Sequence, residues 1–338
     1  LMMLAPADSL ICSIRPSTCA GTPDSSCLGT RPIRAGQFLR TSSWLPPIPP
    51  LATMTAWARN ANSPTVLRDD GAPRGASEGS STAPRTQEVL TEERSGVLVI
   101  TINRPQAKNA VTLAVSEGVA AALDELDARD DLTVAIITGA GGTFCAGMDL
   151  KAFLEGERPS IPGRGFAGIT ERPPRKPVIA AVEGYALAGG CEVAIACDVV
   201  VAAHGSRFGI PEVKRGLVAG GGGLLRLPHR IPYQKAMELA LTGESFTAEQ
   251  AVEWGLVNKL TEPGRALDGA LELAAKITAN GPLAVAATKE IIVKSAEWSR
   301  SEMWQKQNEI MGPVFGSKDA IEGATAFAEK RTPNWTGS

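Results

Sequence analysis

The chain has 338 residues with 43% hydrophobic content, and 34 basic against 36 acidic side chains give it a net charge of −2. These values predict a globular chain with a sizeable apolar core, and they argue against the basic surface that follows nucleic-acid phosphates. The sequence contains no run of about 18 apolar residues, which argues against a membrane-spanning helix. We therefore expect a cytoplasmic protein with no nucleic-acid or membrane partner.

Residues 1–85 differ in composition from the rest of the chain. They hold eleven of the 24 prolines and eight arginines against five acidic residues, with no sustained hydrophobic period. This composition predicts an N-terminal extension that is mostly disordered. Two interpretations stay open, an organelle transit peptide and an over-long reading frame with Met54 as the true start. We expect a folded core at 86–265 and a helical region at 266–338.

Short β-rich runs alternate with helical patterns from residue 97 onward, which is typical of an α/β protein. The predicted strands are 97–102, 134–138, 178–182, 199–201 and 207–210, with helices at 113–126 and between 183 and 196. Beyond residue 233 the strand signal fades, and the pattern predicts helices at 233–241, 247–254, 265–279, 282–298 and 302–311. The end of the chain carries several large apolar side chains, which suggests packing against another subunit. They are Trp298, Trp304, Val314 and Phe315.

Several common catalytic and binding motifs match the sequence only in part, or at positions where the surrounding residues do not support their function. The G-x-S-x-G match at 75–79 lies in the polar extension without a strand before it, and no Gly-Lys pair exists for a phosphate loop. His204 and His229 have no nucleophile beside them, so we interpret both as structural or surface residues. Cys145, Cys191 and Cys197 lack metal-ligand spacing and are expected to be small buried thiols, so that no metal site is predicted.

Three glycine-rich segments carry the functional signal. The first is 143–150, where a strand runs into a turn and leaves the N–H of Met148 free to point outward. The second is 188–192, where glycines precede a helix that carries Glu192 in its first turn. The third contains Glu212 and is followed by four consecutive glycines at 220–223. A strand, a glycine turn and a helix start together favour an oxyanion hole, because unpaired N–H groups and the helix dipole point at one place.

These segments, in this order, resemble the crotonase (enoyl-CoA hydratase/isomerase) superfamily. The likeness covers residues 88–332 and rests on the segments 103–110, 144–149, 182–192, 208–212 and 322–331. The resemblance implies a crotonase-like spiral of ββα units with a helical C-terminal trimerisation region. It also implies a homotrimer or a homohexamer built as a dimer of trimers.

The resemblance assigns roles to individual residues. It places the oxyanion hole at the N–H groups of Met148 and Gly189, and the catalytic acids at Glu192 and Glu212. Two glutamates are what distinguish hydratases in this superfamily. Mutual repulsion and burial are expected to raise the pKa of one of them, so that the pair titrates as a coupled unit, which suits the orientation and deprotonation of a water molecule. The implied coenzyme A contacts are Lys108, Ala110, Ala146, Gly147, Asp149, Leu150, Lys151, Phe315 and Lys330.

The expected activity is that of an enoyl-CoA hydratase, a lyase of fatty acid metabolism and beta-oxidation, which adds water across the 2,3 double bond of a thioester. It needs no cofactor, because coenzyme A is part of the substrate. Two alternatives stay open, an enoyl-CoA isomerase and a non-catalytic acyl-CoA-binding or RNA-binding protein on the same fold. Residues 152–172 mix aromatic and aliphatic residues with prolines and glycines, which predicts a mobile loop over the acyl group. Leu224 and Leu225 stand where the family usually has Thr-Gln.

Overall fold

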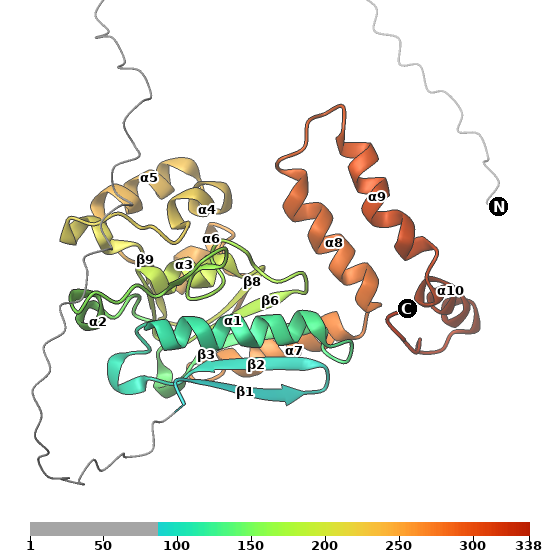
Figure 1. The fold of residues 1–338 in the computed structure, drawn as a ribbon, viewed down its shortest axis with the longest axis horizontal. Helices are drawn as coiled ribbons and strands as arrows, with labels where there is room; N and C mark the ends of the chain where they lie inside the picture. Colours follow the sequence, from blue (N-terminus) through green and yellow to red (C-terminus); the bar gives the residue numbers. More distant parts are fainter. Residues whose placement is uncertain (1–86) are drawn as a thin grey trace, which may run out of the picture. The chain divides into compact units, whose positions relative to one another are not determined.

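The computed structural model describes residues 87–338, and Figure 1 shows this part as a mixed α/β fold. The extension expected at 1–85 lies outside the described residues. A six-stranded sheet has the order β1-β2-β3-β6-β8-β11. Its strands are β1 (Val89–Arg94), β2 (Val97–Ile102), β3 (Val134–Gly139), β6 (Val178–Val182), β8 (Val199–Ala203) and β11 (Lys259–Thr261). The hairpin β1–β2 is antiparallel, and every later neighbour pair is parallel.

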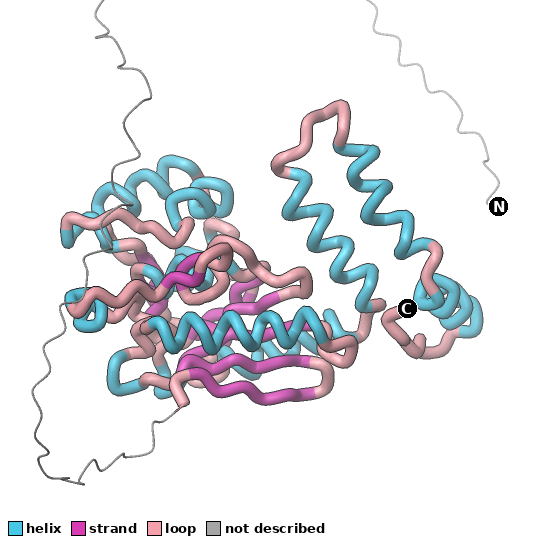
Figure 2. The backbone as a smooth tube through the Cα atoms, viewed as in Figure 1, coloured by secondary structure: helices cyan, strands magenta, loops and turns pink. Residues whose placement is uncertain are grey.

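Both faces of this sheet are buried, which explains the unbroken apolar runs of its central strands. Along β2, Leu98, Ile100 and Ile102 join the larger core cluster, and Val97 and Val99 join the smaller one. Successive side chains of a strand point to opposite faces, so one strand serves two cores. Helix α1 (Leu113–Ala128) packs in the larger core, and helix α7 (Ala266–Thr278) packs in the smaller one. In Figure 2 the central strands lie together as the magenta segments of the fold.

A smaller sheet lies under the second glycine-rich segment. Its order is β10-β9-β7, with β7 (Tyr185–Leu187), β9 (Arg207–Gly209) and β10 (Phe246–Thr247). The chain at Cys145 runs beside β7, because Cys145 N–H donates to the Tyr185 carbonyl at 2.9 Å and its carbonyl accepts from Leu187 N–H at 3.0 Å. Helix α3 (Gly189–Ala196) begins two residues after β7 and is buried along its whole length.

The remaining elements surround these sheets or follow them in the chain. They are the 3-10 turns η1 (Pro105–Ala107), η2 (Ala140–Gly142) and η3 (Pro211–Arg215), the short strands β4 (Ser160–Ile161) and β5 (Gly165–Phe166), and the helices α2 (Leu150–Leu154), α4 (Gly223–Arg230), α5 (Tyr233–Thr242), α6 (Ala248–Glu253), α8 (Pro282–Ser295), α9 (Met303–Phe315) and α10 (Lys318–Glu329).

The predicted strands and helices from residue 97 onward are confirmed in type, and the structure adds elements that the hydrophobic pattern does not reveal. Strand β1 precedes the predicted start at 97, and five of its six residues are exposed, so it has no apolar alternation. Helix α4 contains Pro228 and a glycine start, and α10 is rich in alanine and glycine. The expected boundary between the core and the helical region at residue 265 stays a prediction. Helix α7, which follows this position, packs on the six-stranded sheet.

The cysteines between residues 87 and 338 behave as the sequence predicts. Cys145, Cys191 and Cys197 are free and buried, and burial raises the pKa of each thiol to about 12. Each is therefore a small apolar side chain at neutral pH. None of the helices described is long and apolar enough to cross a membrane.

The closest backbone approach between the sheet region and α3 is at Gly190. A methyl group on this residue would lie 2.7 Å from the carbonyl carbon of Cys145, closer than any side chain tolerates. We expect Gly190→Ala to lower the free energy of unfolding by about 3 kcal/mol, because the backbone must move apart. Gly312→Ala on α9 is the control, since nothing lies within 4 Å of its added methyl group. Urea denaturation checks both, and equal midpoints for the two variants would contradict the packing argument.

Candidate active site

A cavity of about 560 Å³ opens where the three glycine-rich segments meet. Residues from all three segments line it. Its wall includes Met148 from the first segment, Gly189 and Glu192 from the second, and Glu212 with Gly220 and Gly221 from the third. Segments that are far apart in the sequence therefore form one site, as the motif order predicts. Most of the wall is apolar, so charges inside it interact strongly.

The direction of the Met148 N–H is set by its neighbour Val111. The carbonyl of Gly147 accepts a hydrogen bond from Val111 N–H at 2.8 Å, and Asp149 N–H donates to the Val111 carbonyl at 3.0 Å. The peptide unit between Gly147 and Met148 is planar and trans, so its N–H points opposite to its carbonyl. The Met148 N–H thus points away from Val111, and no acceptor for it exists among residues 87–338.

The Gly189 N–H is left unpaired for a different reason. The Ala188 carbonyl accepts hydrogen bonds from Cys191 N–H at 2.9 Å and Glu192 N–H at 3.1 Å, which directs it into the first turn of α3. By the same planarity, the Gly189 N–H points out of the helix start, where the helix dipole is positive. It also has no acceptor in the described chain. A methyl group on Gly147 would lie 3.1 Å from the Gly189 nitrogen, so the two donor segments are in contact.

Residue 189 must be glycine because the side chain of Phe166 leaves no space for a methyl group there. The two-glycine motif in the sequence does not reveal this contact. The aromatic ring of Phe166, from β5, lies 2.5 Å from the position of an added methyl group. Phe166 also lines the cavity. The ring therefore packs directly on the turn that carries the second N–H donor and keeps it apolar on that side.

Glu192 is the most buried acid of the site. Its side chain projects from the first turn of α3, is 3% exposed, and accepts a hydrogen bond at Oε1 from Gly223 N–H at 2.9 Å. Burial raises the pKa of Glu192 to about 7, and repulsion by Glu212 adds to the rise while the Gly223 N–H opposes it. The carboxyl group is thus close to half-protonated near neutral pH.

The third glycine-rich segment encloses this carboxylate. A methyl group on Gly221 would lie 2.7 Å from Glu192 Oε2, and one on Gly223 would lie 3.0 Å from Oε1. The glycines therefore allow the backbone to approach the carboxyl group and to donate an N–H to it. This explains a glycine cluster whose individual roles the sequence does not reveal.

Glu212 stands on η3 and also lines the cavity, as does the exposed Glu171. Burial raises the pKa of Glu212 above the usual range, while the nearby Arg215 acts in the opposite direction. The Oε2 atom of Glu212 is buried and has no hydrogen-bond partner in the described chain. An unpaired buried carboxylate oxygen is costly, so its place in a cavity wall is typical of a functional group.

The predicted site residues divide into two groups. Those that line the cavity are Lys108, Ala146, Met148, Leu150, Gly189, Glu192 and Glu212. Those outside its wall are Ala110, Gly147, Asp149, Lys151, Phe315 and Lys330. Asp149 uses its carboxylate to cap α2 and to pair with Arg104. Phe315 lines a separate, smaller cavity next to Trp335.

The cavity wall has a cation, Lys108, whose surroundings the sequence does not reveal. Lys108 has a left-handed backbone, with φ of 49°, and its ammonium group lies 5.7 Å from the centre of the Tyr185 ring. Both residues line the cavity. The aromatic face of Tyr185 therefore stabilises the cation beside the cavity.

Asn109 is a second residue whose role is visible only in the structure. It is fully buried, and its amide nitrogen donates to the carbonyls of Ala140 and Thr143 at 2.8 and 2.6 Å. Its amide oxygen accepts from Arg104 N–H at 2.9 Å. Asn109 therefore ties the turn that presents Lys108 to the segment that leads into Met148. The backbone of Asn109 has a φ of 55°, a left-handed conformation that asparagine adopts more readily than most residues.

The predicted loop at 152–172 contains part of α2 and the strands β4 and β5. Phe153, Arg158, Ser160 and Phe166 from this segment line the cavity, as expected of a segment beside the acyl group. Its mobility stays a prediction. Across residues 87–338, no group of three or more His, Cys, Asp or Glu side chains is arranged to hold a metal ion.

The chain belongs to the enoyl-CoA hydratase/isomerase family, because the model of that family matches residues 92–338. The superfamily inferred from the motifs is thereby confirmed. Two relatives show the range of named activities in the family. Carnitinyl-CoA dehydratase from Salmonella arizonae is 45% identical over 262 residues, which cover 74% of this chain and 99% of the relative. Enoyl-CoA hydratase EchA19 from Mycobacterium tuberculosis is 42% identical over 259 residues, which cover 73% and 96%.

Solved structures with the same fold are more similar in sequence. Enoyl-CoA hydratase EchA1 from Mycobacterium marinum is 65% identical with a TM-score of 0.74, and the match covers 75% of this chain and all of the other. An enoyl-CoA hydratase from Mycobacterium tuberculosis is 66% identical, with the same TM-score and coverage. The crotonase-type α/β fold with a helical C-terminal region is confirmed by these structures.

The raised pKa of Glu192 predicts how stability depends on pH. Above its ordinary value of 4.5, the unfolded chain loses this proton while the folded chain keeps it up to about pH 7. The contribution to stability is therefore complete below pH 4.5 and is lost as the pH rises through 7. We expect Glu192→Gln to be more stable than wild type by about 3 kcal/mol at pH 8, and little different at pH 4.

Urea unfolding between pH 4 and pH 8 measures this difference. The exposed Glu309→Gln on α9 is the control, since it changes the same charge outside the cavity. A constant difference between Glu192→Gln and wild type across the whole range would show that Glu192 is not buried as a neutral acid.

Proposed function

We propose that this chain is an enoyl-CoA hydratase, a lyase that adds water across the 2,3 double bond of an enoyl-CoA thioester. The observation that carries the proposal is the pair of acids Glu192 and Glu212, which both have raised pKa values and line one cavity with two unpaired N–H groups. The names of the relatives support it, since hydratases and a carnitinyl-CoA dehydratase run the same type of reaction in its two directions.

In the proposed mechanism, the thioester carbonyl accepts hydrogen bonds from the N–H groups of Met148 and Gly189. Attack of the water oxygen at C3 breaks the C2–C3 double bond and moves an electron pair toward this carbonyl, and the enolate is stabilised by the two donors. The acid pair receives one proton from the water and delivers one proton to C2. The reaction is balanced without a redox step, so no cofactor is required beyond the coenzyme A of the substrate.

The acid pair suits this proton exchange. Burial raises the pKa of both carboxyl groups, and the charge of Glu212 raises the pKa of Glu192 further, to about 7, so Glu192 can exchange a proton near neutral pH. A pair with one proton can act as base toward water and as acid toward C2 in the same cycle.

The coenzyme A part is proposed to leave through the mouth at Lys108, where the ammonium group suits a phosphate. The contacts at Ala110, Ala146, Gly147, Leu150 and Lys151 belong to this proposal. Phe315 and Lys330 are proposed to contact the nucleotide across a subunit boundary, in a homotrimer or a dimer of trimers. The exposed apolar side chains of the C-terminal helices support such an interface, since Trp304, Phe315 and Phe327 are 68%, 74% and 88% exposed.

Enoyl-CoA isomerase is the second candidate, because proton transfer between C2 and C4 of a thioester uses the same oxyanion hole. A non-catalytic acyl-CoA-binding or RNA-binding role is the third. The unpaired buried oxygen of Glu212 favours hydration over both, since a single base suffices for isomerisation and binding needs neither acid.

The hydration of crotonyl-CoA tests the proposal, followed by loss of absorbance of the conjugated thioester. We expect wild-type turnover, and a fall of kcat by about 100- to 10,000-fold in Glu192→Gln and in Glu212→Gln. The amide keeps the shape of the side chain and removes its proton chemistry. Glu309→Gln is the control and should match wild type.

Three outcomes separate the candidates. Wild-type turnover retained in either amide variant would refute the two-acid mechanism. Conversion of 3-enoyl-CoA to 2-enoyl-CoA without hydration would establish the isomerase. Binding of crotonyl-CoA without either reaction would establish a non-catalytic protein.

A further inference from the structure

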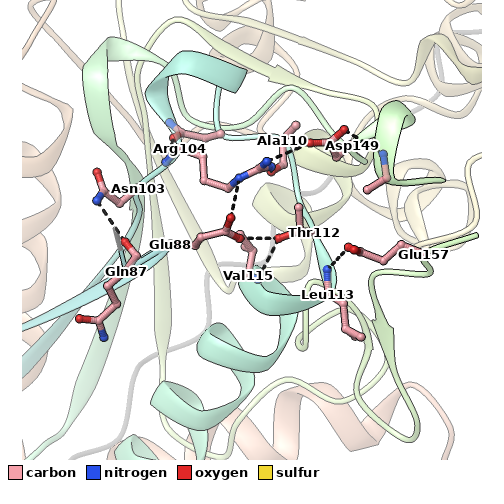
Figure 3. A network of polar contacts seen from close by, with 12 residues as sticks. Gln87, Glu88, Asn103, Arg104, Ala110, Thr112, Leu113, Val115, Asp149 and Glu157 are labelled. Carbon is pink, nitrogen blue, oxygen red and sulfur yellow. Dashed lines mark hydrogen bonds and ion pairs between the residues drawn. The ribbon is translucent and has the colours of Figure 1, made fainter. Parts of the chain in front are cut away.

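Figure 3 shows a network of polar contacts that joins Glu88, Arg104 and Asp149, and Asp149 directly follows Met148 in the chain. Asp149 Oδ1 accepts hydrogen bonds from the N–H groups of Lys151 at 3.0 Å and Ala152 at 3.3 Å, which caps α2. Asp149 Oδ2 accepts from Arg104 Nη2 at 3.0 Å. One carboxylate thus holds the start of a helix and a guanidinium group.

The guanidinium of Arg104 joins the two chain segments that flank Val111 and Met148. Its Nη1 atom donates to the carbonyl of Ala110, the residue before Val111, and Nη2 donates to Asp149, the residue after Met148. Its Nε atom lies 3.1 Å from Glu88 Oε1. The side chains of Arg104 and Asp149 are 14% and 15% exposed, so water screens the pair weakly.

Glu88 connects this pair to the body of the fold. Its Oε2 atom accepts a hydrogen bond from the Thr112 hydroxyl at 2.6 Å, and Thr112 caps α1 through the Val115 N–H. The network therefore runs from the start of α1 through Glu88 and Arg104 to the start of α2. Its ends are a helix packed in the core and the turn that carries the oxyanion donor.

The direction of the Met148 N–H depends on how the two chain segments held by Arg104 pair with each other. The Met148 N–H points away from Val111 because Gly147 and Asp149 both bond to Val111. Those two bonds persist only while the segments at 110–111 and 147–149 stay in register. Arg104 binds the first segment at the Ala110 carbonyl and the second at the Asp149 carboxylate. It therefore helps to hold the two segments in this pairing.

We propose that Arg104 is a positioning residue for oxyanion stabilisation, which fixes the direction of the Met148 N–H through Asp149 and the Ala110 carbonyl. Arg104 is absent from the cavity wall and touches no reacting atom. The proposal rests on the proposed use of the Met148 N–H as an oxyanion donor. A guanidinium suits the task because its fixed fork of donors sets two partners at a defined angle.

The charge state of Asp149 agrees with this arrangement. Burial alone would raise its pKa, but the Arg104 guanidinium and the two capping N–H groups outweigh burial and hold the pKa of this carboxyl below its usual range. The carboxylate is thus ionised at every pH at which Glu192 titrates, and the pair stays intact across the working range.

Arg104→Gln and Asp149→Asn test the proposal, with Asp198→Asn as the matched control. Asparagine at 149 still caps a helix, so this variant removes mainly the charge pairing. Asp198 also accepts from a backbone N–H, that of Val178 at 2.8 Å, and from a cation, Lys289 Nζ at 2.7 Å, but it lies outside the cavity wall. Thermal unfolding of all three variants reports the structural cost.

Two readouts separate positioning from stability. We expect kcat for crotonyl-CoA hydration to fall by about 10- to 100-fold in Arg104→Gln and Asp149→Asn with KM nearly unchanged, because a misdirected donor weakens the transition state more than binding. We expect Arg104→Lys, which keeps the charge and loses the fork, to recover part of this loss. Asp198→Asn should keep wild-type kcat.

The second readout does not depend on hydration. The infrared carbonyl stretch of bound [1-¹³C]butyryl-CoA measures the hydrogen bonds made to the thioester oxygen. We expect it to shift from the wild-type bound value toward the free value in Arg104→Gln and Asp149→Asn. If wild type binds butyryl-CoA but hydrates no enoyl-CoA, the proposed function fails while this shift still tests the positioning role.

An unchanged carbonyl stretch and unchanged kcat in folded Asp149→Asn would overturn the proposal. So would an equal loss of kcat in Asp198→Asn, which would show that any weakened ion pair has the same effect. If Arg104→Gln does not fold, Arg104→Lys and Asp149→Asn carry the test by the same criteria.

Discussion

The contact between Gly190 and the backbone of Cys145 is the constraint on which the rest of the site depends. It brings the start of α3 against the segment that leads to Met148, with no side chain between them. The two unpaired N–H groups then face one cavity, and Glu192 follows one turn further along the buried helix. A wider separation would leave two isolated amides, which could not both donate to a single oxygen atom as the proposed mechanism requires.

Electrostatics in the cavity follow from the same packing. Because α3 is buried along its length, the Glu192 side chain is only 3% exposed, and the backbone at Gly221 and Gly223 lies against its carboxyl group. Burial makes the ionised form expensive, and the Gly223 N–H offsets part of that cost. The result is a carboxyl group that exchanges its proton near neutral pH, which a solvent-exposed glutamate does not do. Burial of this chemically active group therefore lowers the stability of the fold.

Much of this arrangement is predictable from the sequence, and the reasons differ between its parts. The strands from β2 onward carry apolar runs, and the glycine-rich turns at Met148 and Gly189 are visible as motifs in the sequence. The roles of Arg104, Asn109 and Tyr185 are not predictable in this way, because each depends on contacts with residues distant in the chain. Strand β1 and helix α4 are missed for a local reason, since exposure in one and a proline in the other remove the hydrophobic period.

The glycine cluster at 220–223 also has a consequence for how the enzyme can diverge. At Gly221 and Gly223 an added side chain would meet the Glu192 carboxyl group, so these positions cannot be used to reshape the acyl pocket. Leu217 and Val218 lie just before the cluster, also line the cavity, and are 37% and 73% exposed. Substitutions there leave the acid untouched. Side chains at this edge can therefore change the shape of the cavity, while the surroundings of the Glu192 carboxyl group stay constant.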